Sequence, residues 1–352
     1  MSFKNSTAMD LTPAMHRAKL CKNLIHRCSG LHGEMFLGLC SDGHVLSTDI
    51  FRTRTNNDPT VWNDIVSLKT IERSAMGLCS DGTVVTAGKN YLKRGDVSEW
   101  TDIISIAPGV GHTLGLRSDG TVVATGNNDS GQCNVSEWSD IIAVAVGAFH
   151  SVGLKSNGTV VAVGSNEDGK CDVKQWTGVT EILCDPLSTS ALRWDSTPVT
   201  THPGRKDTLS DWKGVRSFAD AHPFFIGISS SGTPYIISKW QDKEGVIRTW
   251  TDVVDVAASY EHILGLRADG TVLSAGLNKK KECEVSHWRD IVAVFAFEGV
   301  SLGIRSDGTV VVAGGGKNAH LVTEWKLFNS IDELEQRFDA RKKTQIKNSI
   351  VF

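Results

Sequence analysis

The stretch from Trp138 to Trp176 reads WSDIIAVAVGAFHSVGLKSNGTVVAVGSNEDGKCDVKQW and holds one complete structural unit. Three short runs of apolar and β-branched residues, at 141–146, 150–155 and 159–163, are separated by turn residues. An Asn-Gly pair lies between the second and third runs, and it tolerates the positive φ that a tight hairpin requires. A fourth extended segment is expected at 171–176. Because no segment has helical periodicity, the unit is predicted to be all-β.

The same unit recurs along the 352 residues of the chain. Tryptophans mark its boundaries at intervals of 36 to 38 residues, and a Gly-Leu-x-Ser-Asp-Gly-like hairpin element recurs beside them. Four short strands repeated in this way are the blade unit of a β-propeller. Eight hairpin elements predict eight four-stranded antiparallel blades, with seven blades as the alternative. The regular spacing favours packing between blades as the role of Trp62, Trp100, Trp138, Trp176, Trp212, Trp250, Trp288 and Trp325.

Short helices are expected on both sides of the propeller. We divide the chain into an N-terminal segment, 1–19, the propeller, 20–325, and a C-terminal helix and tail, 326–352. Thr12-Pro13 favours a helix start, because proline suits the first helical position. Ser330 and Glu333 have the spacing of a capping box. We expect the C-terminal helix to fold back on the propeller, and self-association through it is the alternative; its apolar stripe is Ile331, Leu334 and Phe338.

Composition narrows the class of protein. A hydrophobic fraction of 40% is ordinary for a globular protein. The net charge of −3 is small, and acidic and basic residues are mixed along the chain, which argues against nucleic acid or membrane partners. No apolar run approaches the ~20 residues of a membrane helix. The N-terminus lacks the continuous apolar core of a secretory signal, so we expect a cytoplasmic location. The eight cysteines recur mainly at equivalent repeat positions, too far apart for disulfides, and are expected to be buried and reduced.

Two segments carry a family resemblance. Residues 144–154, VAVGAFHSVGL, and 106–116, IAPGVGHTLGL, resemble the regulator of chromosome condensation repeat. The 38-residue form is similar to the bacterial branch of that family, which includes a secreted propeller-type β-lactamase inhibitor protein. The resemblance covers residues 20–325 and implies a propeller, although one fold hosts many functions.

Two surfaces are candidates for partner binding. The turn before the second strand and the loop after the third strand fall at one end of every blade, so they share a face. In the inhibitor relatives, aromatic residues in that turn contact the partner; here only two of the matching positions are aromatic, which argues against β-lactamase inhibition. The candidates on this face are Phe149, Leu187, His222 and Tyr260.

The second surface comes from units five and six, which depart from the repeat. Pro198 and Pro234 occupy their third strands, so these strands are predicted to be edge-like or irregular. Aromatic and cationic residues are enriched among interface anchors. The candidates in this patch are Trp194, Arg205, Lys206, Phe224, Phe225 and Trp240.

No set of residues in the repeat has the spacing of a catalytic, cofactor-binding or metal-binding site. His112, His150 and His262 fall at one position of separate units, and each is expected to hydrogen-bond within its own blade. We therefore predict a non-enzymatic scaffold that binds a protein partner through a loop face, with no cofactor. The alternatives are a nucleotide-exchange or regulatory factor for a small GTPase, which the family resemblance implies, an enzyme inhibitor, and a hydrolase or lyase with its site at the axis.

Overall fold

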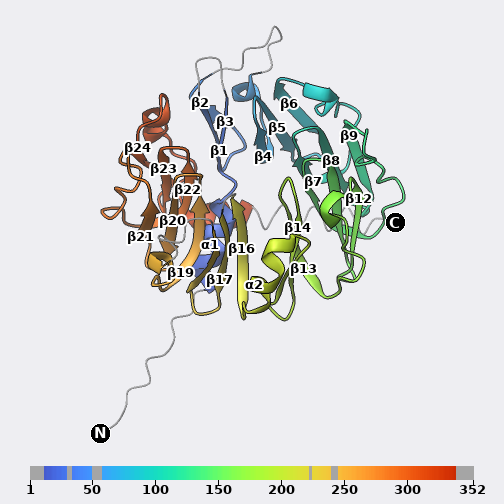
Figure 1. The fold of residues 1–352 in the computed structure, drawn as a ribbon. Helices are drawn as coiled ribbons and strands as arrows, with labels where there is room; N and C mark the ends of the chain where they lie inside the picture. Colours follow the sequence, from blue (N-terminus) through green and yellow to red (C-terminus); the bar gives the residue numbers. More distant parts are fainter. Residues whose placement is uncertain (1–11, 30–33, 50–57, 222–223, 239–244, 338–352) are drawn as a thin grey trace.

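Eight three-stranded antiparallel sheets follow one another around a central axis (Figure 1). The computed structural model describes residues 12–29, 34–49, 58–221, 224–238 and 245–337. In every sheet the three strands are consecutive in the chain, and the middle strand pairs with both neighbours. The eight units predicted from the repeat are therefore present as eight sheets.

The sheets, called blades one to eight in chain order, have short strands. Blades one to four are β1 Ile25–Ser29, β2 Glu34–Leu39, β3 Val45–Ser47; β4 Ile65–Ile71, β5 Ser74–Cys79, β6 Val84–Gly88; β7 Ile103–Pro108, β8 His112–Arg117, β9 Val122–Gly126; β10 Ile141–Val146, β11 His150–Lys155, β12 Val160–Gly164. Blades five to eight are β13 Val179–Cys184, β14 Thr189–Arg193, β15 Pro198–Thr200; β16 Val215–Ala221, β17 Phe224–Ser229, β18 Pro234–Ile237; β19 Val253–Ala258, β20 His262–Arg267, β21 Val272–Gly276; β22 Ile291–Phe297, β23 Val300–Arg305, β24 Val310–Gly314.

The fourth strand predicted for each blade is not found in the described parts of the chain, where every sheet has three strands. In unit four the segment before Trp176 makes local turns: the N–H of Val173 donates to Cys171 O at 2.8 Å, and that of Trp176 to Val173 O at 2.9 Å. Backbone groups bonded within a turn are not free to form a sheet ladder. The segment therefore links one blade to the next as a turn rather than as a strand.

The order of strands gives the ring two different faces. First and second strands are joined on the loop face, which we define as the turns before each second strand and the loops after each third strand. Second and third strands are joined on the opposite hairpin face, where the Asn157-Gly158 turn is typical and Gly158 has φ +79°. In blade five Ser196 takes the glycine position at φ +65°. Pro198 and Pro234 lie in β15 and β18, the third strands and edges of their sheets, as predicted.

Each tryptophan packs on the blade that follows it. A β-carbon built on Gly153 would lie 2.9 Å from Cζ3 of Trp138, so the indole rests on the bare α-carbon. The final tryptophan, Trp325, makes the same contact with Gly38 in blade one. The residues of blades one and eight therefore share one hydrophobic core. The other pairs are Trp62–Gly77, Trp100–Gly115, Trp212–Gly227, Trp250–Gly265 and Trp288–Gly303.

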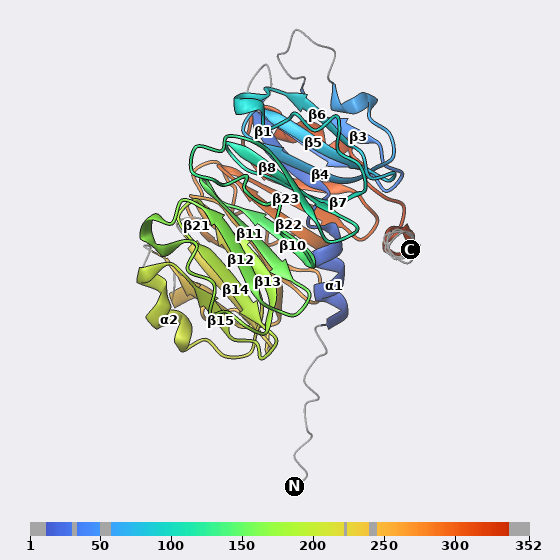
Figure 2. The same cartoon turned by 90° about the vertical axis from the view of Figure 1, so that its right-hand side faces the viewer.

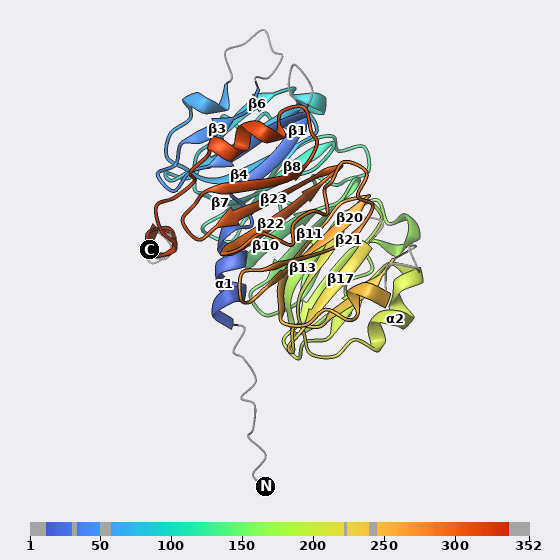
Figure 3. The same cartoon turned by 90° about the vertical axis from the view of Figure 1, so that its left-hand side faces the viewer.

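Short helical turns follow several third strands or connect blades. They are η1 Pro59–Val61, η2 Tyr91–Lys93, η3 Glu167–Gly169, η4 Pro203–Arg205, α2 Lys206–Ser210 and η5 Ala319–Glu324. Helix α1, Thr12–Cys21, lies on the hairpin face, on the side of the ring opposite α2 (Figures 2 and 3). No helix in these described ranges has the length and apolar character needed to cross a bilayer.

The C-terminal helix, described over 331–337, also lies on the hairpin face. Ser330 Oγ accepts the N–H of Glu333 at 3.1 Å, which is one half of the predicted capping box. The Glu333 carboxylate instead accepts a hydrogen bond from Ser41 in blade one at 3.2 Å. Leu334 is buried in the core shared with blade one, so the described part of the helix folds back on the ring. Phe338, predicted to continue the stripe, lies outside the described residues.

Candidate functional site

Three of the predicted partner-binding residues are exposed on the loop face. Phe149, in the turn between β10 and β11, is 55% exposed. Leu187, between β13 and β14, is 57% exposed, and Tyr260, between β19 and β20, is 65% exposed. His222 was predicted for the same face and lies outside the described residues. Large apolar side chains with this exposure are available to a partner.

Three more apolar side chains on this face were missed in the sequence. Tyr91 and Leu92 are 57% and 43% exposed in the loop after β6, and Val110 is 43% exposed in the turn between β7 and β8. A sequence comparison between units reveals the first two, because units three and four carry polar residues at the same positions. Together with the three predicted residues they place exposed apolar groups on five of the eight blades.

The loop that carries Tyr91 has a strained backbone. Leu92 and Lys93 both have positive φ, at 53° and 60°. Gly131 and Gly169 occupy the position of Lys93 in blades three and four, with φ of 79° and 73°. Residues with a β-carbon adopt this conformation at a cost of roughly 1 kcal/mol or more, and such residues gather at functional sites. The loop of blade two thus displays an aromatic and an aliphatic side chain on a strained turn.

Trp194 belongs to the other face of the ring. It lies in the turn between β14 and β15, on the hairpin face, and is 76% exposed. Its indole edge is close to Gly178, where a β-carbon would lie 2.6 Å from Cδ1. Trp194 and Phe149 therefore cannot contribute to one flat contact surface, although the sequence offered both as candidates.

The predicted surface patch of units five and six is largely a core. Phe224 and Phe225 are fully buried, so the prediction that they anchor a partner is wrong. Trp212 stacks on Phe225 with ring centroids 5.7 Å apart. Arg205 is also buried, with its guanidinium 4.8 Å from the Phe225 ring centroid and 3.1 Å from the Asp185 carboxylate.

The remaining two residues of that patch have different outcomes. Lys206, at the start of α2, is exposed and remains a candidate for partner binding. Trp240 lies outside the described residues.

The repeated histidines connect neighbouring blades, not strands of one blade as predicted. His112 Nε2 lies 2.9 Å from Ser151 Oγ in the next blade, and that hydroxyl donates to Gln132 O at 2.7 Å. Because the single hydroxyl hydrogen is used on the carbonyl, His112 must donate from Nε2. His150 and His262 make the same contact with Thr189 at 3.1 Å and Ser301 at 2.7 Å. The histidine position thus forms a chain of hydrogen bonds that ties each of these blades to its neighbour.

Burial keeps these three imidazoles neutral. Desolvation is the main cause that lowers the pKa of His112, His150 and His262 to about 4 in each case. All three side chains are fully buried. Within the described ranges, no group of three or more histidine, cysteine and acidic residues is arranged to hold a metal ion. The three histidines are therefore buried, neutral groups that connect neighbouring blades by hydrogen bonds.

A cavity of about 510 Å³ lies near the axis, between α1 and the inner strands β13, β16 and β19. Lys22, which follows α1, extends its Nζ to 2.7 Å from Asp255 Oδ1 in β19. Glu181 of β13 and Arg216 of β16 also line the cavity, so both signs of charge are present. Helix α1 borders this cavity on the hairpin face, where Ala18 packs in a core with Val254 and Val294 and Lys22 pairs with Asp255.

The comparisons with known proteins agree with this architecture. The family model described as "Regulator of chromosome condensation (RCC1) repeat" matches residues 103–132, 141–170 and 253–281, in units three, four and seven. No curated protein matches the sequence.

Solved structures show the same fold at low identity. The ectodomain of the Arabidopsis thaliana receptor kinase ACR4 aligns with a TM-score of 0.51 and 14% identity, covering 84% of this chain and 96% of that one. The Physcomitrella patens receptor kinase CR4 ectodomain gives 0.51 and 16%, over 72% and 73%. The computationally designed Ika8 protein gives 0.50 and 13%, over 80% and 93%. The chain is therefore a propeller-like repeat protein whose third, fourth and seventh units match the regulator of chromosome condensation repeat.

Proposed function

We propose that this protein is a non-enzymatic scaffold that binds a partner protein through its loop face. The observation that supports the proposal is the gathering of six exposed, large apolar side chains on that face. They come from blades two, three, four, five and seven, and they are Tyr91, Leu92, Val110, Phe149, Leu187 and Tyr260. Aromatic side chains are typical anchors of protein interfaces, because they bury a large area with few rotatable bonds.

The placement of the terminal helices favours the same face. Helix α1 and the helix at 331–337 both pack on the hairpin side of the ring (Figures 2 and 3). Among the described residues, the terminal segments thus leave the apolar groups of the loop face accessible. The strained turn at Leu92 and Lys93 adds support, since it holds Tyr91 at the tip of its loop.

The test compares the two faces by affinity purification from the native host with mass spectrometry. A loop-face variant carries Phe149→Ala, Leu187→Ala and Tyr260→Ala, all exposed positions at which truncation leaves the core intact. Trp194→Ala on the hairpin face is the matched control. We expect the loop-face variant to lose the captured partner at least tenfold and the control to retain it. Equal capture by the wild type and the loop-face variant, or loss only in the control, would reject the loop face.

A further inference from the structure

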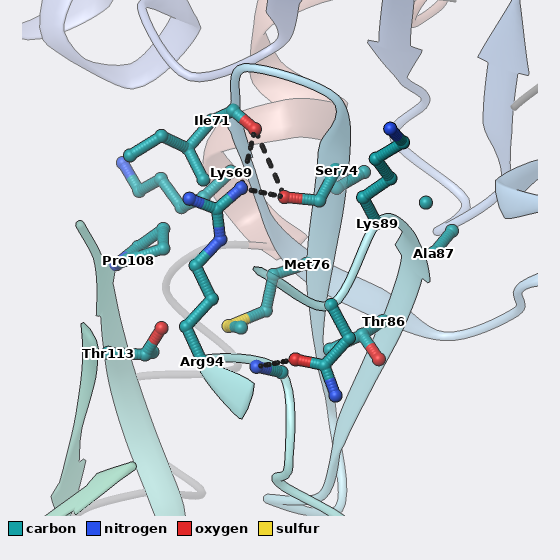
Figure 4. Close-up of a pocket in the computed structure, with 14 residues that line it drawn as sticks. Lys69, Ile71, Ser74, Met76, Thr86, Ala87, Lys89, Arg94, Pro108 and Thr113 are labelled. Atoms are coloured by element: carbon teal, nitrogen blue, oxygen red, sulfur yellow. Dashed lines mark hydrogen bonds between the residues drawn. The ribbon is translucent and has the colours of Figure 1, made fainter. Parts of the chain in front are cut away.

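A small pocket lies between blades two and three, toward the loop face (Figure 4). Arg94, from the loop after β6, crosses it, while Thr113 of β8 and Lys89 at the end of β6 line its sides. Lys89 is exposed, so the pocket reaches solvent. Its volume of about 20 Å³ accommodates one water-sized group.

The Arg94 guanidinium is buried with little opposing charge. Its side chain is 3% exposed, and Nη2 donates to Ser74 Oγ at 3.0 Å and to Ile71 O at 3.4 Å. Nη1 donates to Val110 O in the next blade. Among the described residues, the guanidinium contacts the carboxylate of Glu72, which lies 3.6 Å from Nη1, and the Glu72 side chain is 56% exposed. Burial lowers the pKa of Arg94, which shows how far its charge is removed from water.

Two further polar atoms in the same pocket have no hydrogen-bond partner among the described residues. They are Nε of Arg94 and Oγ1 of Thr113, and both are buried. At the position of Thr113, the hydroxyls of Ser151 and Ser301 donate to the carbonyls of the preceding loops at 2.7 Å. Thr113 makes no such bond. The pocket therefore holds two unused donors, an N–H and an O–H, beside a buried positive charge.

The surroundings of the pocket add positive charge and apolar surface. Lys69 of β4 lines it along with Lys89, giving three basic side chains around one opening. Val110, whose carbonyl accepts from Arg94, and Leu92 lie close together beside it: Leu92 Cδ1 is 3.6 Å from a β-carbon built on Gly111, next to Val110. A group that enters from the loop face thus meets three basic side chains and one carboxylate, with the exposed Leu92 and Val110 nearby.

We propose that this pocket receives the carboxylate of an aspartate or glutamate side chain on the bound partner. The proposal rests on the proposed function and adds the chemistry of one contact to it. A carboxylate oxygen is water-sized, accepts from both Arg94 Nε and Thr113 Oγ1, and brings a second negative charge to a guanidinium whose other carboxylate contact, Glu72, is more than half exposed. Flanking apolar residues of the partner contact Leu92 and Val110.

The test uses acetate as the probe and needs no partner. Thermal unfolding of the full chain is followed at pH 7 in sodium acetate, in sodium chloride of equal ionic strength, and in chloride with acetamide, the uncharged analogue. For the wild type we expect acetate to raise the melting temperature by about 1–2 °C over both references. Arg94→Gln and Thr113→Val lose this rise. Lys170→Gln, at the position of Arg94 in blade four, is the matched control and retains it.

Carbon-13 line broadening of labelled acetate by the wild-type protein gives a second readout, independent of how stable each variant is. Broadening that Thr113→Val abolishes and Lys170→Gln keeps supports the site. Equal shifts in acetate and chloride, or an acetate effect that survives in Arg94→Gln, overturn the proposal. Neither result depends on Phe149 or Tyr260. Loss of the acetate effect therefore rejects the carboxylate site without rejecting partner binding by the loop face, and the two proposals can be distinguished.

Discussion

The indole of Trp325 lies directly on the α-carbon of Gly38, at the position where six other blades have a glycine beneath the preceding tryptophan and blade five has Ala191. A β-carbon on Gly38 would lie 2.8 Å from both Cε3 and Cζ3 of Trp325. The N–H of Ser41 also donates to Leu327 O at 2.7 Å. The two ends of the repeat array are therefore joined by the contact that joins its internal blades, and this closes the ring.

Gly38→Ala should weaken the closure. The added methyl group overlaps the Trp325 ring, and overpacking of this kind costs about 1–3 kcal/mol in unfolding free energy. Urea unfolding followed by circular dichroism measures the change. Gly245→Ala is the control, because a β-carbon there meets nothing within 4 Å. Equal unfolding midpoints for the two variants would show that the contact does not hold the ring.

The repeat spacing was sufficient to predict the sheets, because hairpin turns and β-branched strands are local properties. Asn157-Gly158 requires only its own backbone to form a hairpin. The fourth strand failed for a reason that spacing does not reveal: the segment ending at Trp176 satisfies its own backbone groups in turns. A strand requires residues that favour an extended backbone, but it also requires a neighbouring strand whose backbone N–H and C=O groups are available to pair.

The candidate site was predicted only in part, because exposure depends on tertiary packing. Phe149 and Tyr260 were found from their place in a repeated turn, and both are exposed. Phe224 has the same kind of side chain, yet it starts β17 and is buried. The sequence of a single unit does not show which of its residues the adjacent blade will bury. The histidine contacts were misassigned for the same reason, since Ser151 belongs to the next blade.

Ser151→Ala should destabilise the protein far more than Thr113→Val, although both remove a buried hydroxyl at one repeat position. Ser151 joins His112 to Gln132 O, so its loss leaves a buried N–H and a buried carbonyl unpaired. Each unpaired group costs about 1–3 kcal/mol. The Thr113 hydroxyl has no partner in the described part of the chain, so its isosteric removal should change stability by less than about 1 kcal/mol. Urea unfolding in acetate-free buffer gives both values, and equal losses would contradict the blade-to-blade chain.

Stability should fall as the pH is lowered from about 6.5 toward 4. The pKa of His112, His150 and His262 is about 4 in the folded protein, against 6.5 for an unperturbed histidine. Between these values the unfolded chain binds more protons, so each histidine contributes stability above pH 6.5 that decreases by about 1.4 kcal/mol per pH unit below it. Burial also lowers the pKa of His26 to about 4, so four histidines contribute to this slope. Unfolding free energies at pH 7, 6 and 5 measure it, and His150→Gln should reduce it by about one quarter. Imidazole resonances that titrate near pH 6.5 in the folded protein would refute the assignment.

Lys93→Gly should stabilise the protein and loosen the loop that displays Tyr91. Lys93 holds φ +60° at a position where blades three and four have glycine, and glycine removes the steric cost of this conformation. We expect a gain of about 1 kcal/mol in unfolding free energy. The reverse exchange in blade three, Gly131→Lys, should cost a similar amount, since Gly131 has φ +79°. If the strain serves to hold Tyr91 and Leu92 in place, Lys93→Gly also weakens partner capture while stability rises. A variant that is less stable than the wild type would show that the Lys93 side chain makes a compensating contact.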